Sequence, residues 1–153
     1  MWGRKVVKPG LTALPTGSGK WRYTGDDPRD YNKEYTAPGD GPVRRRLGID
    51  VDRGEVRRFV VQLEYSVDPL ADEWATVVRY DHDAEGSAEA THDVMEEGSY
   101  IDIYRDGKKY DIHELTPPVA ANDALEVAED HLTNHLEGDT RRFEQWHGIN
   151  RIQ

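Results

Sequence analysis

The stretch from Val77 to Asp93, VVRYDHDAEGSAEATHD, holds more potentially reactive side chains than any other part of the sequence. Its candidate catalytic residues are Arg79, Asp81 and His92. A histidine and a carboxylate can act together as a general acid–base pair. An arginine guanidinium can hold a phosphate or an oxyanion. We therefore place a candidate site at these three residues, while the sequence leaves open whether the protein is an enzyme.

The same residues have a structural alternative. Arg79 and Asp81 are two positions apart, and side chains at that spacing share one face of a strand. They can therefore form an ion pair that holds the fold. In this alternative His92 is an ordinary surface residue.

Metal binding is a third alternative. The nearest candidates are Asp81, Asp83 and His92, which offer the oxygen and imidazole ligands of a divalent ion, but their spacing matches no fixed metal motif. His131 and His135 lie four residues apart, as in HExxH, but the Glu after the first His is missing. The sequence therefore assigns no metal and no cofactor.

Period-two alternation of apolar residues predicts the strands that position these groups. The predicted strands are a short one near 47–51, then 56–65, 74–80, 88–95, 99–105 and 108–115. Asp106-Gly107 joins the last two, and this dipeptide is a strong signal for a two-residue hairpin turn. If 74–81 and 88–95 pair in antiparallel fashion, Asp81 and Asp83 lie near the turn and His92 lies on the returning strand.

The C-terminal part of the chain has helical spacing. A helix is predicted from Pro118 or Asn122 to about Leu136, before Gly138, which is a natural residue just past a helix end. Asp139 can cap a second helix, Thr140–Trp146. The predicted class is α+β: an antiparallel sheet of about five strands followed by two C-terminal helices packed on one face.

Residues 1–42 are rich in Gly and Pro and are predicted to form an extended basic arm with aromatic residues, followed by a single α+β domain at 43–150. Basic and aromatic residues alternate from Lys20 to Tyr23. Packing of the arm on the domain or a neighbour, plain disorder, and binding of single-stranded nucleic acid all remain open. Thr16–Lys20 is not a P-loop, because the first Gly and the final Ser or Thr are missing.

The composition indicates where the protein works. The chain has 17 Asp, 14 Arg, only 6 Lys and no Cys, with a net charge of −10. Disulfides and thiolate metal sites are excluded. No apolar run suits a membrane span or a signal peptide, so we expect a cytoplasmic protein without a membrane partner. Asp-rich, Lys-poor chains suit a high-salt cytoplasm, where the Debye length is about 3 Å at ~1 M salt and surface carboxylates repel one another weakly.

Several segments carry a family resemblance: FVVQLEYS (59–66), VVRYDHD (77–83), HDVMEEG (92–98), PPVAANDALEVAEDHL (117–132) and RRFEQWH (141–147). Over roughly residues 40–148 the chain resembles a family of small, functionally uncharacterised haloarchaeal proteins. The order Arg79-Tyr80-Asp81 and a later His also resembles the TumE-type toxins of toxin–antitoxin pairs, which carry Arg-Tyr-Asp-Asn before their histidines. Here His82 replaces the Asn, and the spacing to His92 is longer.

Two functions follow as expectations. The toxin resemblance implies a toxin-like or RNA-directed protein that uses Arg79, Asp81 and His92. The alternative is a non-catalytic protein-interaction module whose arm, residues 1–42, orders on a protein partner or on a second copy of the chain.

Overall fold

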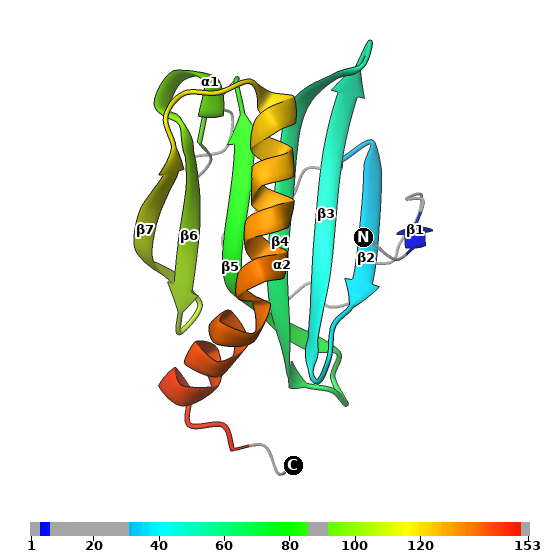
Figure 1. Ribbon diagram of the computed structural model, residues 1–153. Coiled ribbons are helices and arrows are strands. Elements are labelled where there is room, and N and C mark those ends of the chain that lie inside the picture. Colours follow the sequence, from blue (N-terminus) through cyan, green and yellow to red (C-terminus); the bar gives the residue numbers. More distant parts are fainter. Residues whose placement is uncertain (1–3, 7–30, 86–91, 151–153) are drawn as a thin grey trace.

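The computed structural model describes residues 4–6, 31–85 and 92–150 of the 153-residue chain, with the side chains of 4–6 left out. Its strands form one antiparallel sheet in which each strand lies beside the next one along the chain (Figure 1). They are β1 (Arg4–Val6), β2 (Lys33–Pro38), β3 (Val43–Asp52), β4 (Glu55–Asp68), β5 (Glu73–Asp83), β6 (Ser99–Arg105) and β7 (Lys108–Thr116). The predicted α+β class is confirmed, with seven strands instead of about five.

The faces of β4 agree with the alternation in its sequence. Phe59, Val61 and Leu63 join the apolar core between the sheet and the C-terminal helix. Gln62 and Glu64 point to the other face, and they are as deeply buried as the apolar residues, at 0% and 1% exposure. Both faces of the central strands are therefore buried, one by apolar packing and the other among polar groups.

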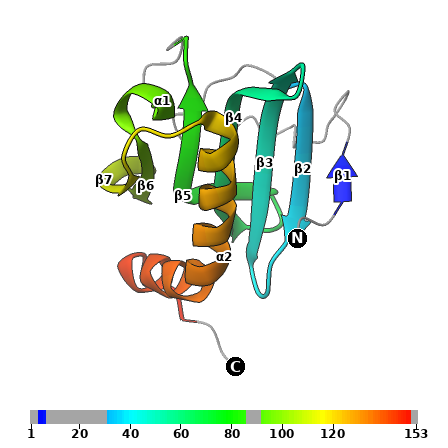
Figure 2. The same ribbon diagram turned by 45° about the horizontal axis from the view of Figure 1, so that its top comes forward.

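One long helix, α2 (Ala121–Trp146), covers the core face of the sheet (Figures 1 and 2). It packs on β4, β5 and β6. Its buried residues near the start are small: Ala121, Ala124 and Ala128. Small side chains allow the helix axis to lie close to the strands, and Leu132 then fills the wider space further along.

The prediction of two C-terminal helices was wrong, because the chain stays helical through Gly138 and Asp139. Figure 1 shows that α2 instead changes direction part-way along its length. The Thr140 hydroxyl donates to the Leu136 carbonyl at 2.8 Å, a bond that often bends a helix. A glycine within a helix costs only about 1 kcal/mol relative to alanine, so tertiary packing can keep the helix continuous.

The predicted strand 88–95 was also wrong within the described residues. Val94–Glu97 form a short helix, α1, and Asp93 is its N-cap, with its side chain accepting from the Met95 amide at 3.1 Å. Asp followed by acidic residues in the first turn is typical of a helix start, and this local preference outweighs the alternation. Residues 86–91 lie outside the described part of the chain.

The sheet extends into the segment that the sequence assigned to the arm, since both β1 and β2 lie there. Tyr31, just before β2, is 5% exposed. Its ring lies so close to Gly48 that a Cβ there would be 2.8 Å away, and the Arg58 guanidinium lies 4.0 Å from the ring centroid. This part of the arm therefore packs on the domain. Predictions for Lys20–Tyr23 concern residues outside the described ranges.

The hairpin between β6 and β7 is confirmed. Its turn residues, Asp106 and Gly107, have φ values of 55° and 76°, which a two-residue hairpin turn of this kind requires. Among the described residues, no helix is both long enough and apolar enough to cross a membrane.

Candidate functional site

The candidate site lies where β5 and β6 meet. These two strands are paired at only two positions, Val78 with Ile103 and Arg79 with Asp102. Beyond this short ladder His92 lies alongside β5, and its carbonyl accepts from the Asp83 amide at 2.8 Å. The backbone thereby brings His92 into the gap between the two strands.

Arg79 and Asp81 form a buried ion pair. The Arg79 Nε lies 2.7 Å from the Asp81 Oδ2, and the two residues are 3% and 2% exposed. Arg79 also donates from Nη1 to the Gln62 side-chain oxygen at 3.2 Å. The predicted ion pair is confirmed, and neither member is open to solvent.

His92 is held on three sides. Its backbone amide donates to Asp81 Oδ1, and its ring Nε2 lies 3.0 Å from Asp102 Oδ1. The ring stacks on Tyr100 with centroids 4.9 Å apart. Only 12% of the side chain is exposed, so the alternative that made His92 an ordinary surface residue was wrong.

Asp102 was missed by the sequence reasoning, although it completes the site. It is 0% exposed and contacts His92 through one oxygen and the Lys109 ammonium, at 3.2 Å, through the other. One signal was available. Asp102 lies inside the apolar strand YIDIY, and an aspartate at a buried position needs partners.

The contacts continue across the sheet as a polar row from β3 to β7. Gln62 donates to Glu64 at 2.5 Å, and Glu64 accepts from Arg44 at 2.7 Å. We use the name polar row for the residues Arg44, Glu64, Gln62, Arg79, Asp81, His92, Asp102 and Lys109. Cations and carboxylates alternate along much of the row, so each charge has an opposite neighbour.

The site shifts the pKa values of His92 and His82 in opposite directions. Burial by itself would lower the pKa of His92, but the hydrogen bond and charge of Asp102, together with the charge of Asp81, outweigh it and raise this pKa. Burial lowers the pKa of His82, despite the nearby charges of Asp93 and Asp83. His82 is 1% exposed and accepts the Val94 amide at Nδ1, so it acts as a neutral acceptor at the start of α1.

A metal ion fits this site poorly. Single ligand atoms of Asp81, His92 and Asp102 lie within 4.8 Å of one another, whereas the predicted ligand Asp83 is not part of this group. Three of the four carboxylate oxygens of the two aspartates already lie 2.7–3.0 Å from a hydrogen-bond donor. The fourth, Asp102 Oδ2, makes no hydrogen bond but lies 3.2 Å from the Lys109 ammonium. Arg79 and Lys109 balance the two carboxylates, so a divalent ion would add two uncompensated positive charges. The geometry therefore favours an ion-pair network.

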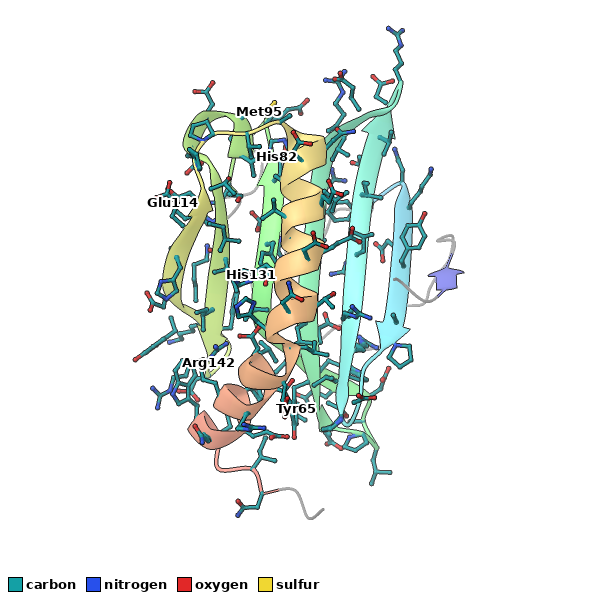
Figure 3. All side chains as sticks on the ribbon, viewed as in Figure 1. Tyr65, His82, Met95, Glu114, His131 and Arg142 are labelled. Carbon is teal, nitrogen blue, oxygen red and sulfur yellow. The ribbon has the colours of Figure 1, made fainter. Side chains whose placement is uncertain are left out.

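His131 is half-buried beside the sheet, and His135, one turn further along α2, is exposed (Figure 3 labels His131). Their rings stack with centroids 4.0 Å apart. His131 Nδ1 lies 2.8 Å from the Tyr80 hydroxyl, and His135 Nδ1 donates to the His131 carbonyl. Within the described residues no further ligand joins them to make a group of three. The pair therefore has a packing role in this structure.

Comparison with known proteins places the chain in a family. A search of the curated proteins and a search of the solved structures found no match. A family model described as a domain of unknown function, DUF7718, matches residues 30–149. The match runs from just before β2 to just past α2, so it includes the whole polar row. The chain therefore belongs to the DUF7718 family.

Proposed function

We propose that the protein acts on RNA, with His92 as its general acid–base group. The observation that carries this proposal is the contact between His92 Nε2 and Asp102 Oδ1 at 3.0 Å. An ionised carboxylate only accepts, so Nε2 carries the proton and Nδ1 is the nitrogen that can exchange protons with a substrate. Nδ1 points toward Glu97, a half-exposed residue 3.8 Å away.

The arrangement suits cleavage of an RNA phosphodiester. Neutral His92 would take the proton of the ribose 2′-hydroxyl at Nδ1, and the 2′-oxygen would form a bond to phosphorus. The 5′-oxygen would then leave with its electron pair and take up that proton. Such a reaction needs no metal, but it needs positive charge near the phosphoryl oxygens.

Lys109 is the residue that can supply this charge. A quarter of its side chain is exposed, whereas Arg79 is almost completely buried. We therefore give Arg79 and Asp81 a positioning role: Arg79 holds one oxygen of Asp81, and the other oxygen holds the His92 backbone. Tyr100, stacked on His92, offers an aromatic face beside the site.

The test is a cleavage assay on labelled single-stranded RNA with purified protein at about 1 M salt. His92→Gln should lower the cleavage rate by about 100-fold or more, the usual size of a general acid–base contribution. His113→Gln is the matched control, because His113 also has an aspartate partner, Asp111 at 3.2 Å, but is 58% exposed. It should cleave at the wild-type rate.

Two results would overturn the proposal. One is a wild-type protein that leaves the RNA intact. The other is a His92→Gln variant that cleaves as fast as the His113→Gln control. In cells, expression of the wild type should arrest growth and expression of His92→Gln should not, as expected of a toxin-like protein.

We also propose that the protein comes from the cytoplasm of a haloarchaeon. The support is the composition, with 17 Asp against 6 Lys. Its unfolding midpoint should then rise between about 0.1 M and about 1 M potassium chloride, because screening removes repulsion among carboxylates. A neighbouring gene for a small DNA-binding antitoxin would support the toxin–antitoxin assignment.

A non-catalytic protein-interaction module is the second candidate. One observation favours it: β7 is an edge strand in which none of the nine residues is buried. The role of the arm is tested by deleting residues 1–30, which removes the three-residue β1 but spares β2, whereas deletion of 1–42 would remove both strands. If the shortened chain still associates with its partner, the arm is not the binding segment.

A further inference from the structure

β7 ends the sheet on the side away from β1, and its outer edge has no neighbouring strand within the described residues. Figure 3 labels one of its residues, Glu114, at this edge. Two apolar side chains on β7 are exposed, Tyr110 at 56% and Ile112 at 45%. An edge strand with exposed apolar side chains is a template for pairing with another strand.

The sequence of β7 is complementary to itself when read in the opposite direction. If Ile112 lies at the centre of an antiparallel pair, residues at equal distances on either side face one another. Ile112 then faces Ile112, and Asp111 faces His113. The register with β6 shifts at Tyr110 and again at Leu115, so the regular part of β7 is Asp111 to Glu114 and the pairing around Ile112 is confined to it. No two like charges are opposed in this part.

We infer that β7 pairs with β7 of a second copy of this chain, around a twofold axis at Ile112, so that the two sheets become one. This inference is independent of the proposed action on RNA. The pattern of the strand chooses this occupant, because Asp111 and His113 face each other on both sides of the axis at Ile112.

The contacts within one chain are consistent with such a pair. Asp111 and His113 already lie 3.2 Å apart on the same strand. In the dimer, two such pairs would meet at the axis, with each carboxylate facing an imidazole of the other copy. The Ile112 amide now donates to the Asp111 carboxylate at 2.9 Å. On pairing, the Ile112 amide would instead donate to the Ile112 carbonyl of the second copy. The Asp111 carboxylate would then be left to face His113.

The test is the oligomeric state of the full chain by sedimentation equilibrium, from about 1 µM to about 1 mM at about 1 M salt. Ile112→Lys puts two lysines face to face and should raise the dimer dissociation constant about tenfold or more. Val67→Lys is the matched control, because Val67 is a β-branched residue of nearly the same exposure, 44% against 45%, on a different strand. It should leave the constant within about twofold of the wild type.

A charge exchange tests the register. Asp111→Lys removes the carboxylate that faces His113 of the second copy and should weaken the dimer several-fold, because the cross-strand pair is lost. Adding His113→Asp restores opposite charges and should return the dissociation constant close to the wild-type value. A protein that stays monomeric over the whole range overturns the inference. So does an Ile112→Lys variant that dimerises like Val67→Lys, or a charge exchange that fails to restore the dimer.

Discussion

Removing the positive charge of Arg79 should lower the free energy of unfolding by a large fraction of its total. In Arg79→Met, the Asp81 carboxylate loses its donor at 2.7 Å and keeps the His92 amide at 3.0 Å. Asp81 is 2% exposed, so water cannot replace the guanidinium. Breaking a buried ion pair from one side costs about 3–5 kcal/mol. This is a large part of the roughly 5–15 kcal/mol by which domains are usually stable.

A second variant separates the unpaired charge from lost packing. Asp81→Asn, added to Arg79→Met, removes the charge but keeps an oxygen that can accept the His92 amide. About half or more of the lost free energy of unfolding should therefore return, because the uncompensated charge causes most of the penalty. Arg57→Met is the matched control. Arg57 pairs with Asp52 at 3.4 Å, but both side chains are more than half exposed, at 61% and 57%. Its loss should cost about 0.5 kcal/mol or less.

Urea unfolding at about 1 M salt measures these differences, because urea carries no charge and leaves the ionic strength unchanged. The four tryptophans, of which Trp74 and Trp146 lie in the described part of the chain, provide the fluorescence signal. The reasoning is refuted if Arg79→Met costs less than about 1 kcal/mol, or if it costs the same as Arg57→Met. Either outcome would mean that Asp81 does not depend on Arg79 and can be charged without it.

Three further predictions concern pH and backbone. The pKa of His92 is raised in the folded state, so its protonation stabilises the protein fully at pH values below the unfolded pKa of about 6.5. This stabilisation is lost as the pH rises through the folded pKa. The difference in unfolding free energy between wild type and His92→Gln should therefore fall over that window. The lowered folded pKa of His82 has the opposite sign, so wild type should lose stability relative to His82→Gln as pH falls below about 6.5. Gly98→Ala should lower the free energy of unfolding in urea by about 3 kcal/mol or more, because φ is +93° and the new Cβ would lie 2.2 Å from the Thr116 carbonyl oxygen. Gly138→Ala is the control: Gly138 has open space around it in α2, so this change should stabilise the protein by up to about 1 kcal/mol.

Local patterns predicted much of the sheet. Alternation along β4 predicted which residues face the core, and Asp106-Gly107 predicted the last hairpin. Local patterns failed where a residue type has two common uses. Gly138 can end a helix or lie within one, and the choice depended on packing against the sheet. Tyr65 shows this packing: its hydroxyl donates to Glu144 at 2.7 Å and its ring stacks on Phe143, beyond the bend (Figure 3).

The sequence by itself determined that Arg79 and Asp81 share a face of the strand, because residues two apart on a strand do so wherever that strand lies, and it therefore offered their ion pair as one alternative. It could not determine that His92 meets Asp102. That contact requires β5 and β6 to pair at only two positions, so that His92 can enter beyond the ladder. Strand partners and register are set by the packing of the whole sheet. Tertiary structure alone therefore joined separate charges into one polar row in which His92 meets Asp102.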